Sequence, residues 1–169
     1  MREVVNLEKI VGDHIISYKG SFYDKTDNTL NVIMELCQSN LRAIMMKQTF
    51  SREELLSFIV QIVSAFLELS SKGLMHLDLK PENILISGGD YFKICDFGCS
   101  QSTPRSVLSH YNTNIFGTFN YLAPELSSNY QGHYTKSSAD VWSLGIILYE
   151  MVYRVLPFRT GKDRCVLHQ

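Results

Sequence analysis

The spacing of apolar and polar positions predicts that the first part of the chain is rich in strands. Apolar residues at helical spacing predict a short helix over Glu3–Ile10, which ends where Gly12 and Asp13 follow. Two strands are expected next, over His14–Phe22 and Thr29–Leu36, because a polar turn separates two apolar runs. The residues after the second strand become polar, which indicates a linker.

The next part of the chain is predicted to be helical. A short helix over Leu41–Met46 precedes a long helix over Leu55–Leu69, whose start is marked by a capping box of Ser51 and Glu54. Apolar residues surround the long helix, so we expect it to be buried on most sides. Gly73 is well placed to end it in a left-handed conformation.

The C-terminal part is expected to contain a mobile segment and a second apolar helix. Residues 100–114 are rich in Ser, Thr and Asn, which is typical of a long mobile segment. The helix is predicted over Ala139–Tyr153, with Ser137 or Ser138 as its cap. Pro157 follows the helix.

A hairpin is predicted between these helical regions. Apolar runs over Ile84–Ser87 and Tyr91–Cys95 read as two strands, and Gly88-Gly89 provides the turn. Such a hairpin brings its two outer ends together in space.

Polar residues lie at both outer ends of this hairpin. Asp78, Lys80 and Asn83 precede the first strand, and Asp96 follows the second. Carboxylate and amide oxygens are ligands suited to Mg²⁺, and a lysine beside them suits a phosphate. The sequence therefore predicts a site for a metal–nucleotide complex.

Composition narrows the class of protein. The chain has 169 residues, of which 45% are hydrophobic, and this is enough for one domain with a real core. A net charge of −1 gives no reason to expect nucleic acid or an anionic membrane as a partner. The longest apolar stretch, Leu144–Tyr149, is far shorter than the roughly 20 residues that cross a bilayer, so no membrane segment is expected.

Cysteine and histidine usage points to an intracellular protein. The four cysteines contain no Cys-x-x-Cys pair, which favours reduced, buried thiols in the cytoplasm or nucleus over disulfides or a metal site. The five histidines form no close pair with ligand spacing, so a zinc site is not expected. No signal peptide is visible, and the oligomeric state is left open.

Four motifs in this order make the chain resemble a eukaryotic protein kinase of the Ser/Thr type. They are His76-Leu77-Asp78 with Asn83, Asp96-Phe97-Gly98, Ala123-Pro124-Glu125, and the run from Asp140 to Gly145. A lone Asp-Phe-Gly would be weak evidence, whereas four motifs in the family's order make coincidence negligible. The resemblance covers the chain from about Glu3 to Phe158.

The resemblance implies ATP and Mg²⁺ as cofactors and a protein Ser or Thr hydroxyl as the acceptor. Asp78 would accept the hydroxyl proton, and Lys80 would neutralise charge on the transferred phosphoryl group. Asn83 and Asp96 would hold Mg²⁺. Lys80 and Thr118 both fit the pattern of kinases that phosphorylate Ser and Thr.

Further positions are implied for nucleotide binding. Met34 would guard the back of the pocket, Glu35 and Cys37 would offer main-chain groups to adenine, and Leu85 would form its floor. Glu3 aligns with the family's helix glutamate that pairs with the nucleotide lysine.

The remaining implied positions are structural or regulatory. His76 and Phe97 would stack with Leu7 and Tyr18 as the family's internal hydrophobic column, which is equally a description of core packing. Asp140 would be a buried carboxylate that accepts N–H bonds from the catalytic loop. Three other positions belong to this group, namely Leu77, Gly98 and Glu125.

The implied architecture is an α+β, partial protein-kinase-like bilobal fold. Residues 1–36 would be a remnant of the N-lobe sheet plus its helix, 37–40 a hinge, and 41–169 an incomplete, mainly helical C-lobe. A cleft at the hinge is the expected place for a ligand.

One departure from the family is Leu77, where an arginine usually stands. Leucine has no donor for a phosphate, so we expect less dependence on phosphorylation of segment 99–122. That segment carries candidate phosphorylation sites at Thr103, Ser109 and Thr113, although a solvated Ser/Thr-rich loop is the favoured interpretation of each.

The larger departure is at the two ends of the chain. The ten glycines contain no G-x-G-x-x-G, no strand with a lysine precedes Glu3, and the arginine that would pair with Glu125 is absent. We therefore expect a fragment or a truncated gene model, poorly stable and at most weakly active by itself. The alternative is a truncated pseudokinase that acts as a scaffold or regulator.

Overall fold

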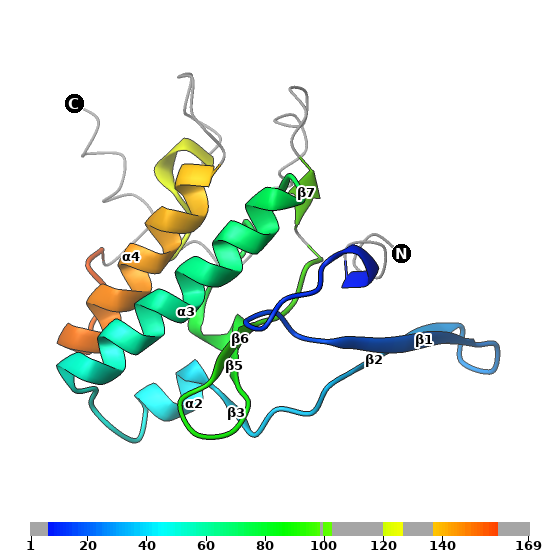
Figure 1. Cartoon of the computed structure of the whole chain (residues 1–169), viewed down its shortest axis with the longest axis horizontal. Coiled ribbons are helices and arrows are strands. Elements are labelled where there is room, and N and C mark those ends of the chain that lie inside the picture. The colour runs from blue at the N-terminus through cyan, green and yellow to red at the C-terminus, as the bar shows by residue number, and fades with distance from the viewer. Residues whose placement is uncertain (1–6, 99, 103–119, 127–136, 159–169) are drawn as a thin grey trace.

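The computed structural model describes residues 7–98, 100–102, 120–126 and 137–158 (Figure 1). These residues form small antiparallel sheets and two long helices, so the expected α+β class is confirmed. Residues 7–9 are helical and agree with the end of the first predicted helix.

A two-stranded hairpin projects from the rest of the molecule (Figure 1). Strands β1 (Tyr18–Asp24) and β2 (Thr29–Met34) pair in antiparallel fashion with no third strand beside them in the described residues. The carboxylates of Asp24 and Asp27 each accept a backbone N–H from two residues further on, which shapes the turn. Most residues of the hairpin are exposed or half-buried.

The predicted strand His14–Phe22 is wrong in its first half. Residues 14–16 instead run parallel to strand β6 (Phe92–Ile94): Ile16 donates to Ile94 at 2.9 Å, and Ile94 donates to His14 at 2.9 Å. Two successive isoleucines at 15 and 16 are both buried. The projecting hairpin is too exposed to bury these two isoleucines. The segment that carries them therefore pairs with β6 before the chain enters β1.

A three-stranded sheet lies between the hairpin and the helices. Its order is β3 (Ser39–Asn40), β5 (Ile84–Ile86) and β6. The β5–β6 hairpin confirms the predicted one, and Gly88 and Gly89 have the positive φ angles that its turn requires. Strand β3 was not predicted, because two polar residues carry no strand pattern.

Two helices follow the linker. The short helix α2 (Leu41–Met45) begins where the side chain of Asn40 caps it, and the long helix α3 spans Arg52–Ser71. The predicted capping box is confirmed, since Ser51 and Glu54 bond each other's backbone N–H. Gly73 has a φ of 65°, as predicted for the residue that ends this helix.

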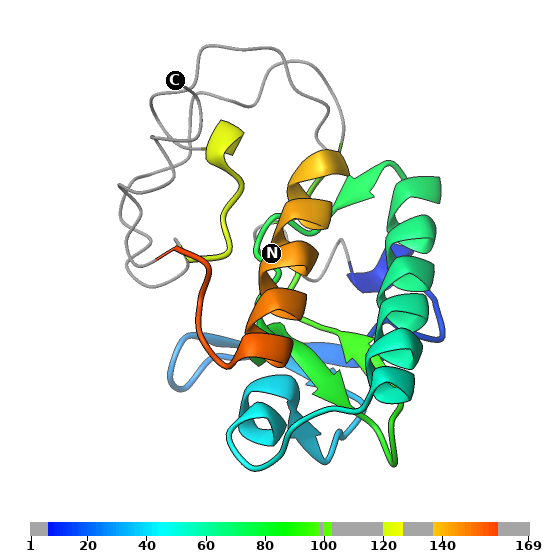
Figure 2. The same ribbon diagram turned by 90° about the vertical axis from the view of Figure 1, so that its left-hand side faces the viewer.

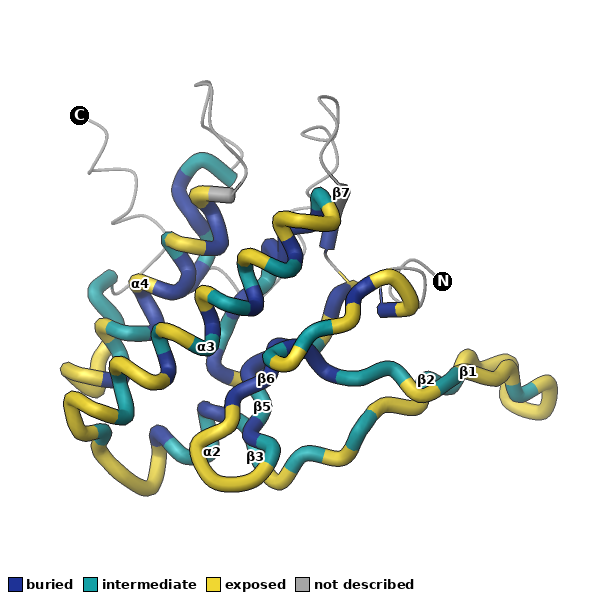
Figure 3. Tube along the Cα trace, in the orientation of Figure 1, coloured by how far each residue is buried: buried dark blue, intermediate teal, exposed yellow. Residues whose placement is uncertain are grey.

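The prediction that the long helix is buried on most sides is wrong. One stripe faces the core, and another is 40–67% exposed (Figure 3). The buried stripe is Phe58, Ile62, Ala65 and Leu69, and the exposed one is Leu56, Val60, Val63 and Leu67. The described neighbours of α3 include β4 (Leu74–Met75), β6 and α4 (Ser137–Tyr153), which leave its outer side uncovered.

By length and composition, α3 is also able to cross a membrane, and no other helix of the described residues is. A helix that packs one face on a core passes the same test, so this is weak evidence for a membrane segment. The expectation of none stays a prediction.

The last elements complete the helical part. Strand β4 (Leu74–Met75) pairs with β7 (Gln101–Ser102), and helix α4 spans Ser137–Tyr153. Ser138 therefore lies inside the helix and is not its cap. Helices α3 and α4 run side by side in opposite directions (Figure 2).

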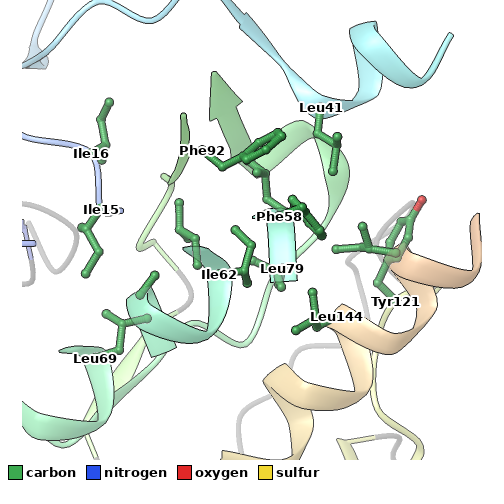
Figure 4. Close-up of a cluster of buried hydrophobic side chains, with 14 of the residues drawn as sticks. Ile15, Ile16, Leu41, Phe58, Ile62, Leu69, Leu79, Phe92, Tyr121 and Leu144 are labelled. Atoms are coloured by element: carbon green, nitrogen blue, oxygen red, sulfur yellow. The ribbon is translucent and has the colours of Figure 1, made fainter. Parts of the chain in front are cut away.

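The core joins all of these parts. Figure 4 shows Phe58 of α3 between Phe92 of β6 and Leu144 of α4, with Ile62 of the same helix in the same cluster. The close-up also shows Ile15 at the edge of the cluster, so the segment before β1 packs on the same core.

The two leucines Leu67 and Leu69 test this arrangement of α3, because they are 67% and 2% exposed. Leu69→Ala should lower the free energy of unfolding by about 2–5 kcal/mol, since it leaves a cavity. Leu67→Ala on the same helix should cost less than about 0.5 kcal/mol. Urea unfolding of both variants measures the difference, and equal losses would show that the outer face of α3 is covered in solution.

Candidate active site

The candidate site lies where the two ends of the β5–β6 hairpin meet. A short 3-10 helix, η1 (Pro81–Asn83), leads into β5, and Asp96 follows β6. The N–H of Cys95 donates to the carbonyl of Asn83 at 2.9 Å, which closes the open end of the hairpin. The structure thus brings the loop before β5 next to the loop after β6.

Three polar side chains converge in the first of these loops. The ammonium of Lys80 lies 3.0 Å from Oδ2 of Asp78, and the amide of Asn83 donates to the carbonyl of Asp78 at 2.9 Å. The other carboxylate oxygen of Asp78, Oδ1, is buried and has no partner among the described residues. A buried acceptor without a donor is costly, so this oxygen is an acceptor position of the site that the described residues leave unfilled.

Asp96 presents its carboxylate to solvent at the other end of the hairpin. It has a φ of 65°, and its Oδ1 accepts the N–H of Gly98 at 3.3 Å. The next residue, Phe97, is fully buried. The left-handed turn at Asp96 therefore separates an exposed acid from a buried aromatic ring.

The oxygens of Asn83 and Asp96 fit a magnesium ion. The amide oxygen of Asn83 takes part in no hydrogen bond between the described residues, because only its nitrogen donates to Asp78. No group of three or more His, Cys, Asp or Glu side chains with metal-site geometry occurs in the described residues. Mg²⁺ needs no such group, since it usually takes one or two protein ligands and completes its shell with phosphates and water.

Asp140 holds the backbone of the loop in place. From the first turn of α4, its two carboxylate oxygens accept the N–H groups of His76 and Leu77, both at 2.8 Å. Leu77 has a φ of 66°, an uncommon conformation for a residue other than glycine. The two hydrogen bonds to the buried carboxylate therefore stabilise a strained backbone conformation immediately before Asp78.

His76 connects the two loops through the core. Its Nε2 lies 2.9 Å from the carbonyl of Cys95, and its ring meets that of Phe97 edge to face at 5.2 Å. Leu7 and Phe97 belong to the same buried cluster, and Tyr18 packs against it. This is core packing, and the implied role as a regulatory column stays a prediction.

The implied nucleotide-binding positions lie at the linker and beside it. Met34 ends β2, Leu85 is half-buried in β5, and Cys37 is a half-buried free thiol. Burial and the charge of Glu35 raise the pKa of Cys37. The side chain of Glu35 points to Lys93 in β6, 2.7 Å away.

Sequence reasoning missed Lys93. A lysine inside the apolar run of β6 is a signal that could have been used, because lysine is almost never buried unless it is paired.

It also missed a polar cluster around Arg42. The guanidinium donates to Glu82 at 2.8 Å and to Glu150 at 2.7 Å, and it also bonds the hydroxyl of Tyr121. Burial and the bond to Glu150 raise the pKa of Tyr121, so the phenol stays neutral. No local pattern in the sequence predicts this cluster, since the partners lie 40 to 108 residues away from Arg42.

Several predicted positions lie outside the described residues. They are Glu3, Thr103, Ser109, Thr113 and Thr118. Glu125 is described, and it corrects one expectation: the residue is only half-buried, and its carboxylate accepts the hydroxyl of Ser138 at 3.0 Å. It is therefore not left unpaired.

Comparison with known proteins agrees with this geometry. The family described as "Protein kinase domain" matches residues 1–169. The chain is 38% identical over 162 residues to the probable serine/threonine-protein kinase nek3 of Dictyostelium discoideum, a match that covers 89% of this chain and 14% of that protein. It is 31% identical over 169 residues to an Aurora kinase of the same organism, with 99% and 42% covered.

A third relative is the serine/threonine-protein kinase mph1 of Schizosaccharomyces pombe. It is 33% identical over 170 residues, which cover 92% of this chain and 25% of that protein. The chain thus spans less than half the length of these curated relatives.

The bonds from Asp140 can be tested by Asp140→Asn, which keeps the shape of the side chain. Its NH₂ group would face one of the two N–H donors, so we expect a loss of about 2–3 kcal/mol in unfolding free energy. The exposed Asp90→Asn is the matched control and should stay within about 0.5 kcal/mol of the wild type. Urea unfolding measures both, and a neutral Asp140→Asn would contradict the anchoring role.

Proposed function

Because this chain belongs to the protein kinase family, we propose that its site transfers the terminal phosphoryl group of ATP to a Ser or Thr hydroxyl of a protein. The observation that carries this proposal is the carboxylate of Asp78. One oxygen is held by Lys80, and the other is buried and has no partner in the part of the chain that the structure describes. A substrate hydroxyl that donates to this free oxygen would be oriented for attack and would lose its proton to it.

Lys80 has a second role in this proposal. Its ammonium lies beside Asp78 and is only partly exposed. The ammonium would neutralise the charge that develops on the transferred phosphoryl group. Because it already lies beside Asp78, the loop that carries both residues would not have to move. The bond between Lys80 and Asp78 also keeps the acceptor oxygen in a fixed direction.

Asn83 and Asp96 are the residues whose oxygens would hold magnesium. When bound, the ion would neutralise the phosphate charges and help to align them. Both residues are held independently of it, since Asn83 bonds the loop backbone and Asp96 bonds Gly98. The protein side of the site is therefore preorganised.

The choice of Ser and Thr as acceptors is supported by the relatives, three of which carry the words serine/threonine-protein kinase in their names. It is also supported by Lys80 in the run Asp78-Leu79-Lys80-Pro81-Glu82-Asn83, which is typical of this class. The substrate protein and its pathway are not specified by these residues.

Magnesium-dependent nucleotide binding can be tested by thermal unfolding of the chain. Saturating Mg²⁺–ATP should raise the Tm by about 2–5 °C, because a ligand that binds only the folded state stabilises it. Asp96→Asn should remove most of the shift, while the exposed Lys47→Met should keep it. A chain that shows no shift in any variant would contradict nucleotide binding and favour a scaffold.

Phosphoryl transfer itself can be tested with Asp78→Asn. On any preparation of the protein that turns over, we expect kcat to fall by about 10²–10⁴-fold, because the amide cannot accept the hydroxyl proton. The shift in Tm with Mg²⁺–ATP should stay, since Asp78 is not proposed to bind nucleotide. The chain contains no glycine-rich phosphate loop, so slow turnover is expected, and rapid turnover by the isolated chain would contradict that expectation.

A further inference from the structure

One carboxylate joins three segments of the chain. Oε1 of Glu35 accepts the backbone N–H of Ser17 at 2.7 Å and the ammonium of Lys93 at 2.7 Å. Ser17 precedes β1, Glu35 follows β2, and Lys93 lies in β6. This side chain therefore links the projecting hairpin to the sheet that carries the candidate site.

Lys93 is a buried lysine whose charge is paired with that of Glu35. The residue is only 8% exposed, and a buried ammonium is costly unless an opposite charge lies close to it. Glu35 provides that charge, and the ring of Tyr91 lies 5.9 Å from the ammonium. Among the described residues, no other carboxylate forms an ion pair with Lys93.

The carboxylate of Glu35 stays charged at neutral pH. Burial by itself would raise the pKa of Glu35, but the hydrogen bonds from Lys93 and Ser17 outweigh it and hold the pKa below its usual range. Glu35 is therefore an anionic partner for Lys93 near pH 7.

The linker Glu35–Gln38 is anchored at both of its ends. The N–H of Glu35 donates to Ser17 at 3.0 Å, and that of Gln38 donates to Ile86 at 2.8 Å. Leu36 and Cys37 lie between these anchors and take part in no backbone hydrogen bond within the described residues. Leu36 is also 95% exposed. Two peptide groups with free donors and acceptors are therefore held between two fixed points.

The same ion pair connects the linker to the strand that leads to Asp96, one of the two proposed magnesium ligands. Lys93 lies in β6, and Asp96 follows it by three residues, just after that strand ends. Its neighbour Ile94 is bonded to the segment before β1 on both its N–H and its carbonyl. A movement of the linker away from β6 would have to break the Glu35–Lys93 contact first.

We propose that the Glu35–Lys93 pair is a positioning element for nucleotide binding, which holds the free peptide groups of Leu36 and Cys37 in a fixed place relative to Asp96. This inference rests on the proposed nucleotide site and names the residues that set its geometry. Neither side chain need touch the nucleotide, because the effect is carried by the backbone of the linker and of β6.

Four variants distinguish the positioning of the linker from a general contribution of the ion pair to the stability of the fold. Lys93→Met removes the charge but keeps most of the length, and Lys93→Arg keeps the charge. The double variant Glu35→Gln with Lys93→Met removes both charges but retains an oxygen that can accept from Ser17. Lys47→Met, which removes an exposed lysine, is the matched control.

The first measurement is amide hydrogen exchange in the 169-residue chain without nucleotide. In Lys93→Met, exchange in segments 15–18 and 34–38 should become about tenfold faster, while α3 and α4 should exchange as before. Lys93→Arg and Lys47→Met should match the wild type, and the double variant should fall between. Unchanged exchange in the two segments, or a uniform increase across all elements, would overturn the proposal.

The second measurement is the Kd of Mg²⁺–ATP, determined by calorimetry. We expect Lys93→Met to weaken binding by about tenfold and Lys93→Arg to keep it, with a smaller loss in the double variant than in Lys93→Met, because no buried charge is left without a partner. Equal affinities of wild type and Lys93→Met would overturn the positioning role. A wild type that binds no nucleotide would instead refute the proposed function, and the exchange result would still decide whether the pair holds the linker.

Discussion

The pairing of β5 with β6 is the constraint on which the candidate site depends. The register places Ile84 opposite Ile94, and the hairpin closes where Cys95 donates to Asn83. A slip of one residue would turn every side chain of β6 to the opposite face. Phe92 would then leave the core, and the approach to Asp96 would change. The apolar residues of the hairpin therefore determine where its polar ends lie.

Around this hairpin, buried or half-buried charges tie together segments that are far apart in sequence. Asp140 of α4 holds the backbone before Asp78, Arg42 of α2 bonds the loop and α4, and Glu35 bonds Lys93. Breaking the contacts of Asp140 or Lys93 is costly, because a buried charge would be left without its hydrogen-bond donors or its counter-charge. Such contacts contribute little to the overall stability, but they favour one arrangement of the elements. That arrangement places the loop before β5 beside the loop after β6.

Local signals in the sequence were sufficient to predict helix α3 and the β5–β6 hairpin. Ser51 and Glu54 marked the start of α3, and Gly88-Gly89 marked the turn of the hairpin, because capping and turn formation depend on residues a few positions apart. The burial of α3 could not be predicted in this way. Its apolar residues surround the helix, and only the placement of β4, β6 and α4 decides that Leu69 is buried while Leu67 is exposed.

The sequence by itself determined the chemistry of the protein: an acid, a lysine, an amide and a second acid in the order of a protein kinase, on loops at the ends of one hairpin. Residue type and short spacing carry that information. Only the tertiary structure decided how these groups are held, since the partners of Arg42, Glu35 and Asp140 lie 18 to 108 residues away from them. Contacts over such separations leave no periodic pattern in the chain, because they depend on how whole elements pack.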